Sequence, residues 1–438
     1  MTGGVDISGG GVLGRLFCMR SITGQVHYKM QEIKGGVEVS PIRILFASPY
    51  CLLDTTSGAA ISIRDLLGKL ARKGLTCEAV TASSFDPPRQ VLLDAVIDHQ
   101  RLSIITKPEI PESIPCVRVM DGDLTHTILR TARSQRQALN SREESALLSL
   151  IEGKISAFKP DIILTYGGLS VELSIHRLAR AAKIPVVFFL ANGLYTKAET
   201  FADVDLIIVP SGFLSEFYSR RLGIRSEVLR DIIREDRYFV ENRNPRFITY
   251  INPAPQKGMT LFARLVGEAL KEIPQAQFLV VEGRWTQADV ARTGFRLDRI
   301  PNIKIITNQI DMRPVYAATK VLLFPSFWNE ASGRTIGEAQ LNGIPVMASR
   351  LGGIPENLNG GGFLFDIPER CTENHMAIPT AGEVRPWIDQ LRLLLEDEEA
   401  CEEAQGRALL AAAAFGSERI AQRAMDLFHR LLDGELFR

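Results

Sequence analysis

Residues 329–349, NEASGRTIGEAQLNGIPVMAS, combine a polar loop, a short helical pattern and an apolar strand. Asn342 and Gly343 can end the helix, and IPVMAS after them has the composition of a buried strand. Glu330 and Glu338 lie eight positions apart around the predicted helix start. Because a helix N-terminus is positively polarised and suits an anion, two carboxylates at this place require an explanation.

Strand and helix patterns alternate on both sides of this stretch. Amphipathic patterns such as Ile63, Leu66 and Leu70 on one helix face lie between the strands. Strand–helix–strand units favour a parallel sheet. We therefore predict an α/β protein with two Rossmann-like, doubly wound parallel-sheet lobes that face each other across a cleft. The strands are expected at 42–48, 75–82, 161–167, 185–192 and 204–211, and at 246–252, 276–283, 303–308 and 320–326.

Composition and periodicity also suggest where the parts of the chain begin and end. Residues 1–41 are rich in glycine and have little periodicity, which predicts a flexible extension. The polar segment 234–245 ends in proline and separates a first lobe at 42–242 from a second lobe at 243–415. The amphipathic pattern at 416–438 predicts a final helix that completes the first lobe.

Charge and cysteine usage argue against several classes of function. The 51 Lys and Arg residues equal the 51 Asp and Glu residues, which argues against a protein that binds nucleic acid through a basic surface. The six cysteines and six histidines show no ligand spacing, so we predict no metal site. Since no apolar run approaches the ~18 residues of a membrane span, the expected location is the cytoplasm.

A ligand that carries both phosphates and sugars would explain the two glutamates. The strand at 320–326 ends where an open parallel sheet presents its binding crevice. Ser332 is the predicted N-cap of the following helix. The backbone N–H groups of Gly333, Arg334 and Thr335 would then be free for a diphosphate, while the glutamates accept sugar hydroxyl groups. For two glutamates alone, the plainer explanation of solvated acids near a helix start would be preferred.

The residues around the glutamates resemble the donor-lobe motif of glycosyltransferase family 4, a family of retaining transferases with the GT-B fold. SRLGGIPE at 349–356 resembles the Gly–Gly–x–x–Glu continuation of that motif. PAPQKG resembles the lysine loop of the family, and TTSGAAISIRDLLGKLARKG resembles its first-lobe loop and helix. The resemblance runs from about 42 to 435 and is strongest over 320–356. The motif positions are Pro325–Ser326, Glu330, Gly333, Glu338–Ala339, Gly343 and Pro345–Val346.

The resemblance implies a role for each matched residue. Glu330 would act as a catalytic residue that holds the hydroxyl groups of the donor sugar, and Glu338 would hold the ribose. Lys257 would neutralise charge on the leaving diphosphate, together with the amides after Gly333. Gly58 would let the first-lobe backbone approach the donor when the lobes close.

The resemblance also implies an activity. A hexose-type sugar would move from a nucleotide-diphosphate sugar to a saccharide or lipid-linked acceptor in glycan, polysaccharide or glycoconjugate biosynthesis. The reaction would retain the anomeric configuration and need no metal ion, no cofactor and no protein nucleophile. A lipid-linked acceptor would bring the protein to the inner face of the membrane as a peripheral contact. Two rival hypotheses are a nucleotide-sugar-binding protein without turnover and another GT-B enzyme, such as a nucleotide-sugar epimerase.

Two departures from the family pattern concern positive charge and the acceptor side. Many members pair the lysine with an arginine five positions earlier, where this chain has Asn252. Arg284 and Arg334 could supply the missing charge at the donor, although Arg284 could equally be a solvated loop residue. Tyr166 and Asn192 stand near the places of the usual first-lobe histidines, and Asn192 is a candidate catalytic residue. Asn–Gly is also a common turn, and for Asn192 this explanation is slightly preferred.

Overall fold

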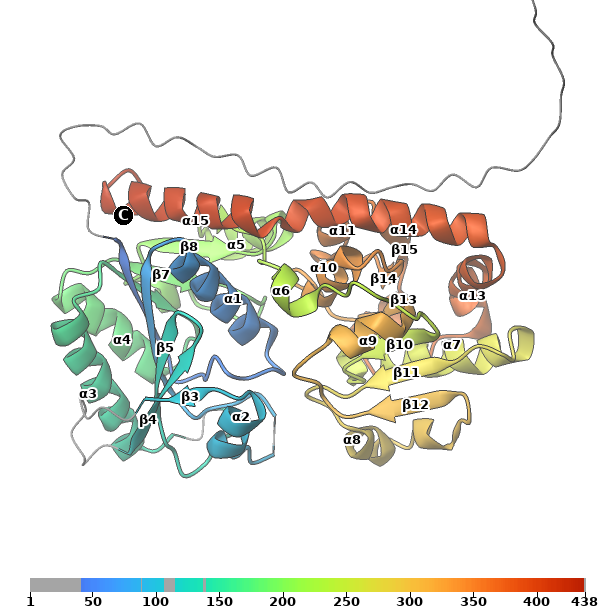
Figure 1. Ribbon diagram of the computed structural model, residues 1–438, viewed down its shortest axis with the longest axis horizontal. Coiled ribbons are helices and arrows are strands. Elements are labelled where there is room, and N and C mark those ends of the chain that lie inside the picture. The colour runs from blue at the N-terminus through green and yellow to red at the C-terminus, as the bar shows by residue number, and fades with distance from the viewer. Residues whose placement is uncertain (1–40, 88, 106–114, 137–138, 437–438) are drawn as a thin grey trace, which may run out of the picture. The chain divides into compact units, whose positions relative to one another are not determined.

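The computed structural model describes residues 41–87, 89–105, 115–136 and 139–436. The extension predicted at 1–41 therefore lies outside the described residues except for its last position. Pro41–Arg438 form one compact unit. Its described residues contain a nine-stranded and a six-stranded sheet, each with helices around it (Figure 1), so the predicted α/β class with two Rossmann-like lobes is confirmed.

The first lobe is built on the sheet with the order β3-β4-β5-β2-β1-β6-β7-β8-β9. Alternate residues of β1 face opposite sides, so Ile44 and Phe46 share a core with α1 while Leu45 and Ala47 share one with α3 and α4. The strands are β1 (Arg43–Ala47), β2 (Thr76–Ala82), β3 (Ser103–Ile104), β4 (Cys116–Asp121), β5 (Leu124–Leu129), β6 (Ile162–Thr165), β7 (Val186–Phe189), β8 (Leu206–Val209) and β9 (Glu227–Val228). The helices are α1 (Gly58–Arg72), α2 (Leu93–His99), α3 (Ser141–Phe158), α4 (Ser170–Ala181), η1 (Ala198–Phe201) and α5 (Gly212–Leu222).

The antiparallel hairpin of β4 and β5 was not among the predicted strands. Asp121 pairs with Leu124 across a two-residue turn in which Gly122 has a φ of 61°, a conformation that glycine adopts without strain. β5 then pairs with β2 in parallel, so the hairpin extends the first sheet at one edge. The Gly–Asp pair at 122–123, between two apolar stretches, is the sequence signal that would have revealed it.

The second lobe has the strand order β12-β11-β10-β13-β14-β15, the usual arrangement of a doubly wound nucleotide-binding sheet. All five neighbouring strand pairs are parallel, so the loops after β10 and β13 meet at one edge. The strands are β10 (Phe247–Ile251), β11 (Phe278–Val281), β12 (Ile303–Ile306), β13 (Thr319–Phe324), β14 (Val346–Ser349) and β15 (Gly362–Phe365). The helices are η2 (Pro255–Lys257), α7 (Met259–Glu272), α8 (Gln287–Arg292), η3 (Leu297–Arg299), α9 (Arg313–Ala318), α10 (Arg334–Leu341), α11 (Ile354–Leu358), α12 (Glu369–Glu373), α13 (Ala381–Glu396) and α14 (Glu398–Ala412).

Two segments connect the sheets. The short helix α6 (Glu235–Tyr238) lies between β9 and β10 along the chain. After α14, the turn η4 (Ala413–Phe415) leads to the final helix α15 (Ser417–Leu432), whose apolar residues belong to the first-lobe core. Ile420, Ala424 and Phe428 are among them.

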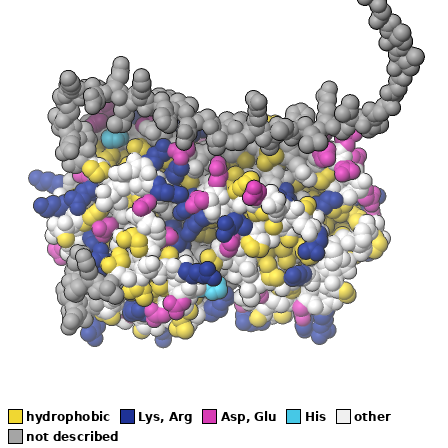
Figure 2. Space-filling view, in the orientation of Figure 1, with side chains coloured by type: hydrophobic (Ala, Val, Ile, Leu, Met, Phe, Trp, Pro, Cys, Tyr) yellow, Lys and Arg dark blue, Asp and Glu magenta, His cyan; other side chains and the backbone are white. Residues whose placement is uncertain are grey.

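Charged side chains are mixed on the described surface. On the face shown in Figure 2, Lys and Arg side chains are interspersed with Asp and Glu side chains, in keeping with the equal totals of 51 and 51. Within the described ranges, every helix is too short or too polar to cross a membrane.

Candidate functional site

The loops that follow β10 and β13 interlock at the carboxyl edge of the second sheet. Gly258 is the N-cap of α7 and has a φ of 83°, and a Cβ at this position would lie 1.8 Å from the carbonyl oxygen of Pro325. Phe327 N–H donates to the carbonyl of Gln256 at 3.0 Å and ties the two loops together. Only glycine fits at 258, because both the backbone conformation and the space exclude a side chain.

Lys257 and Glu330 meet where these loops interlock. Lys257 Nζ lies 2.5 Å from Glu330 Oε1, and the Ser326 hydroxyl donates to the same oxygen at 2.7 Å. The side chains of Glu330 and Lys257 are 11% and 27% exposed, so both are sheltered yet reachable from solvent. Two residues that are 73 positions apart in the sequence, and that were each predicted to be catalytic, are thus direct neighbours.

The Gly–Gly pair of SRLGGIPE supports the backbone of Glu330. Gly353 N–H donates to the carbonyl of Glu330 at 2.7 Å. A Cβ on Gly352 would lie 2.6 Å from the backbone nitrogen and oxygen of Glu330. The two glycines therefore allow one loop to lie against another, which holds Glu330 beside Lys257.

Helix α10 starts one residue later than predicted. The N-cap is Gly333, with a φ of 88°, so the prediction that Ser332 caps the helix is wrong. Gly333 has no side chain to satisfy the first N–H groups of α10, and they are left without a side-chain cap. Asn357 Nδ2 donates a hydrogen bond to the Gly333 carbonyl at 3.0 Å. Thr335, the second residue of α10, is half-buried at this end of the helix.

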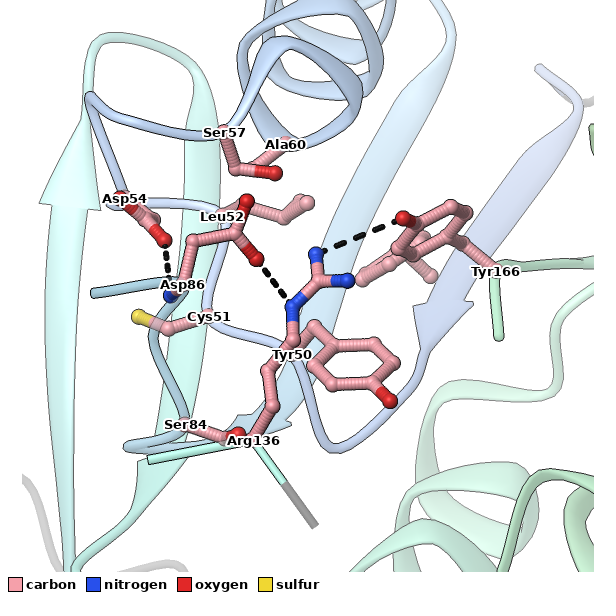
Figure 3. Close-up of a pocket in the computed structure, with 11 residues that line it drawn as sticks. Tyr50, Cys51, Leu52, Asp54, Ser57, Ala60, Ser84, Asp86, Arg136 and Tyr166 are labelled. Carbon is pink, nitrogen blue, oxygen red and sulfur yellow. Dashed lines mark hydrogen bonds and ion pairs between the residues drawn. The ribbon is translucent and has the colours of Figure 1, made fainter. Parts of the chain in front are cut away.

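Arg284 of the second lobe pairs with a carboxylate of the first lobe. It follows β11 and forms an ion pair with Asp86, a buried carboxylate that also pairs with Arg136 of the first lobe (Figure 3). Asn252 has a φ of 61°, and its Oδ1 accepts a bond from Trp285 N–H at 3.2 Å. Asparagine tolerates this left-handed conformation better than arginine, which accounts for its presence at the end of β10.

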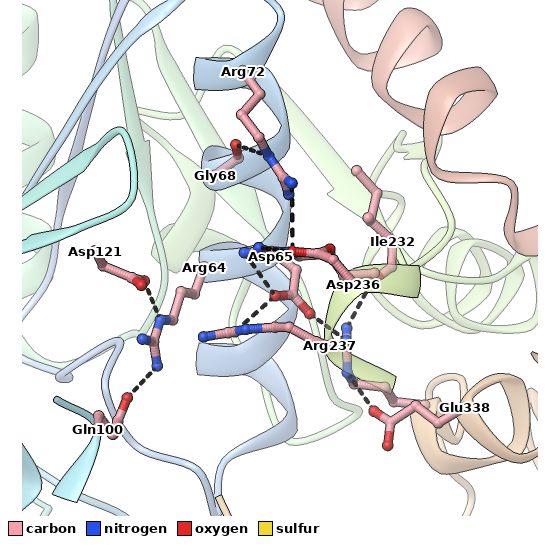
Figure 4. Close-up of polar contacts among 12 residues, drawn as sticks. Arg64, Asp65, Gly68, Arg72, Gln100, Asp121, Ile232, Asp236, Arg237 and Glu338 are labelled. Carbon is pink, nitrogen blue, oxygen red and sulfur yellow. Dashed lines mark hydrogen bonds and ion pairs between the residues drawn. The ribbon is translucent and has the colours of Figure 1, made fainter. Parts of the chain in front are cut away.

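Arg334 and Glu338 form a buried ionic network one turn apart on α10 (Figure 4). Arg334 Nε donates to Glu338 Oε1 at 2.9 Å, and Nη1 donates to the carbonyl of Ile232 at 3.0 Å. The hydroxyl of Tyr316 donates to Glu338 Oε2 at 2.5 Å. Both oxygens of Glu338 are therefore engaged within the chain. Burial raises the pKa of the Glu338 carboxyl, and the nearby Arg334 opposes this rise.

The same network joins the lobes through Asp65 of α1. Its fully buried carboxylate pairs with Arg334 of α10 and accepts a bond from Arg237 Nη1 at 3.0 Å. Asp65 lies seven residues after Gly58, the exposed first residue of α1. Like α10, α1 lacks a side-chain cap at its N-terminus. Asp65 thus connects α1, whose first residue Gly58 was predicted to approach the donor, with α10, whose start was predicted to bind it.

Asn192 takes part in a local turn. Its Oδ1 accepts a bond from Leu194 N–H at 3.0 Å, and its carbonyl accepts one from the Tyr218 hydroxyl at 2.8 Å. This Asx turn is the local explanation that Asn–Gly suggested. A catalytic role for Asn192 stays a prediction, as do the donor roles of the other matched residues.

Sequence reasoning missed Asp65, Asp86, Arg136 and Tyr316. Each is polar and takes part in the contacts described above. Asp65 lies in the stretch that resembles the first-lobe helix of the family, although no role was predicted for it, and the other three stand in no recognisable motif. Arg334 and Asp65 are 269 positions apart, so their pairing leaves no local pattern. A polar residue within the amphipathic helix of that stretch was a signal for Asp65.

Comparisons with known proteins agree with this geometry. Residues 245–397, which contain the interlocked loops and α10, match the family model described as glycosyl transferases group 1. Sulfoquinovosyl transferase SQD2 of Arabidopsis thaliana is 26% identical over 304 residues, which are 59% of this chain and 54% of that protein. D-inositol 3-phosphate glycosyltransferase of Corynebacterium diphtheriae is 32% identical over 152 residues, 32% of each chain. The matches thus span about half, or a third, of the length of these relatives.

Solved structures show the fold. A glycosyltransferase from Rickettsia africae superposes with a TM-score of 0.63 at 16% identity, covering 90% of this chain and 99% of that one. HepE from Anabaena, solved with UDP and glucose, gives a TM-score of 0.61 at 16% identity over 89% of this chain and 99% of its own. The fold is therefore GT-B, and residues 245–397 of its second lobe match the group 1 glycosyl transferase model.

Proposed function

We propose that this protein is a retaining glycosyltransferase of the family 4 type, which transfers a hexose-type sugar from a nucleotide-diphosphate donor to an acceptor. The contact between Lys257 and Glu330 carries the proposal. It joins the residue predicted to neutralise the diphosphate to the residue predicted to hold the sugar, near the uncapped start of α10. The match of residues 245–397 to group 1 glycosyl transferases supports the same donor class.

The transfer breaks the bond between the anomeric carbon and the diphosphate oxygen. The acceptor hydroxyl oxygen bonds to the same face of that carbon, and its proton passes to the departing diphosphate. Lys257 and the free N–H groups of α10 counter the charge that grows on the leaving group, an effect typically worth ~10²–10³-fold in rate for one donor group. These groups provide positive charge without a metal ion. Glu330 holds the sugar hydroxyl groups, so that the ring stays aligned during the transfer.

Glu338 is the proposed ribose contact. Each carboxylate oxygen can accept two hydrogen bonds, so the bonds from Arg334 and Tyr316 leave further lone pairs for hydroxyl groups. The ribose must nevertheless enter beside Arg334, which is 8% exposed. Donor binding is therefore expected to shift Arg334.

The test uses the purified full chain with UDP-glucose, ADP-glucose and GDP-mannose, in EDTA and in Mg²⁺, with and without a panel of saccharide and lipid-linked acceptors. Lys257→Ala and Glu338→Ala are expected to lower donor consumption by about 100-fold or more. Lys271→Ala is the matched control, because Lys271 is exposed on α7 and pairs with Glu268. Equal activity of the wild type and both variants would overturn the proposal, and dependence on Mg²⁺ would overturn its metal-free form.

A binding protein without turnover is the second candidate. The closed network around Glu338 and the presence of Asn252 in place of an arginine favour it over a nucleotide-sugar epimerase. Such a binding protein would be stabilised by a nucleotide sugar but would form no product with any acceptor. Conversion of the donor without an acceptor would instead indicate the epimerase.

We place the reaction in the cytoplasm, in glycan or glycoconjugate biosynthesis. A lipid-linked acceptor would add a peripheral membrane contact, and co-sedimentation with anionic vesicles tests it. Failure to sediment at low salt would exclude that contact.

A further inference from the structure

A second polar centre lies in the first lobe, apart from the Lys257–Glu330 pair. It surrounds a cavity of about 10 Å³ at the ends of β1, β2, β5 and β6 (Figure 3). These four strands run parallel, so the residues after them converge on one edge of the sheet. This is the edge where open α/β sheets bind ligands. Tyr50, Ser84, Asp86, Arg136 and Tyr166 are among its lining residues.

The guanidinium of Arg136 lines this cavity. It lies 4.5 Å from the ring centroid of Tyr50 and 5.8 Å from that of Tyr166, and it pairs with Asp86. The Arg136 side chain is 32% exposed, whereas that of Asp86 is 2% exposed. Arg136 can therefore turn outward into solvent, while the residues around it remain buried.

Asp86 would remain paired if Arg136 turned outward. Its second oxygen pairs with Arg284, which comes from the second lobe and is 42% exposed. A buried carboxylate without any partner would cost several kcal/mol, so this second cation is what makes the outward movement of Arg136 accessible. Asp86 therefore has this second cation only when both lobes are in contact.

Once Arg136 has turned outward, the enlarged cavity, called the hollow below, would bring together groups that can recognise one edge of a sugar ring. The Tyr50 face would be uncovered for the C–H side of a ring, and Asp86 would accept a hydroxyl hydrogen bond. Ser84 Oγ is buried beside the cavity and, among the described residues, has no hydrogen-bond partner. It provides a second polar contact for a neighbouring hydroxyl group.

The charges around the hollow discriminate against anions. Asp54 and Asp86 are both buried, and Asp54 Oδ2 accepts a bond from Asp86 N–H at 2.6 Å. Burial, together with the charge of Asp86, raises the pKa of Asp54. With Arg136 turned outward, these two carboxylates would face one remaining cation among the described residues, Arg284, so a phosphate or carboxylate would be less favourable here than hydroxyl groups that donate to the carboxylates.

We propose that this hollow seats the terminal, uncharged sugar of the acceptor, that Asp86 and Ser84 bind two neighbouring hydroxyl groups, and that the sugar displaces Arg136. The proposal rests on the proposed glycosyltransferase function and names the acceptor class for it. Because Arg284 of the second lobe balances Asp86, acceptor binding is coupled to contact between the lobes.

Binding of acceptor analogues tests the proposal without requiring turnover. The full chain is titrated, with and without saturating UDP, with the methyl glycosides of glucose, galactose, mannose and N-acetylglucosamine and with glucose 6-phosphate, and binding is followed by saturation-transfer NMR. At least one glycoside is expected to bind more tightly than glucose 6-phosphate. Asp86→Asn and Ser84→Ala should weaken it at least fivefold, and Arg136→Ala should tighten it because no side chain has to leave.

The controls separate this proposal from the general function. Asp311→Asn removes an exposed carboxylate paired with Arg313 and should leave glycoside binding unchanged. UDP binding, measured in parallel by thermal shift, reports the donor site alone. If UDP binds but no glycoside does, or if Arg136→Ala weakens glycoside binding, the proposed acceptor site is wrong. The proposed donor function is then unaffected. Tighter binding of glucose 6-phosphate than of every glycoside would also overturn the proposed acceptor site. Ser84→Ala and Arg136→Ala keep the test decisive if Asp86→Asn does not fold.

Discussion

The carboxyl edges of the two sheets hold polar residues in different ways. In the second lobe, Lys257 and Glu330 are held by loops in close backbone contact, and Gly258 and Gly352 make that contact sterically feasible. In the first lobe, Asp86 is held by side chains from separate loops and from the other lobe. The second lobe therefore constrains residue types at fixed spacings, whereas the first lobe constrains pairs of distant side chains. Substitutions should reveal this difference.

The largest effect is expected from Asp65→Asn, which removes the charge that joins α1 to Arg334 and Arg237. Loss of one partner from a buried ionic network leaves uncompensated charge and typically costs ~3–5 kcal/mol. We expect a loss of this size in the free energy of unfolding, measured by chemical denaturation. Asp389→Asn, at an exposed residue paired with Arg385, is the control and should change stability by less than about 0.5 kcal/mol. Equal stabilities for the two variants would show that the contact between lobes contributes little.

The next effect concerns catalysis in the second lobe. Glu330→Gln keeps the shape of the side chain but removes the charge proposed to hold the donor sugar, so the transfer rate should fall by ~10²–10³-fold. UDP lacks the sugar and should bind the variant within about twofold of the wild type. Glu403→Gln, at an exposed residue paired with Arg407, serves as the control. A large loss of UDP affinity would assign Glu330 to the nucleotide instead of the sugar.

A third effect should appear as a pH dependence of stability in the first lobe. Burial raises the pKa of Glu172 on α4 from 4.5 to about 7. Between these two values the unfolded chain releases a proton that the folded chain keeps, so the Glu172 contribution to stability falls as pH rises. Glu172→Gln should therefore gain ~3 kcal/mol of stability relative to the wild type between pH 4.5 and pH 8, at about 1.4 kcal/mol per pKa unit. Chemical denaturation at several pH values measures this gain.

His176, one turn further along α4, acts in the opposite direction. Burial lowers its pKa from 6.5 to about 4, so its contribution to stability is lost as pH falls from 6.5 towards 4. In the wild type, both Glu172 and His176 contribute to the pH dependence of stability. In Glu172→Gln, only the contribution of His176 remains of these two. Glu152→Gln, at an exposed position of α3, should follow the wild type at every pH. A pH profile of Glu172→Gln parallel to that of the wild type would contradict the assignment.

The smallest effect is expected at Asn192. Asn192→Ala removes the acceptor of the Leu194 N–H bond and should cost ~0.5–1.5 kcal/mol, with less than a tenfold change in transfer rate. Asn192→Asp keeps an acceptor oxygen and should retain the stability of the wild type. If the alanine variant instead lost activity by more than 100-fold at unchanged stability, Asn192 would be a catalytic residue.

The lobes also differ in what could be predicted from the sequence. The parallel strands were predictable because each is a short apolar run followed by a helical pattern, and Lys257 and Glu330 were found through motif residues whose spacing the loops constrain. The hairpin of β4 and β5 was missed, although the Gly–Asp pair of its turn was visible in the sequence. Ser332 was mistaken for the N-cap because a glycine in a left-handed conformation can begin a helix equally well. The ion pairs of Asp65 and Asp86 could not be predicted, because their partners in the other lobe come near only in the folded chain.

The packing of α15 on the first sheet has a consequence for biosynthesis. A ribosome releases the strands of the first lobe before the second lobe, but Ile420, Ala424 and Phe428 of the first-lobe core emerge only after the second lobe. The apolar face of the first lobe on which α15 packs therefore stays exposed while the second lobe is translated, which favours chaperone binding. Of the two lobes, the one whose translation starts first is thus the one whose core is completed last.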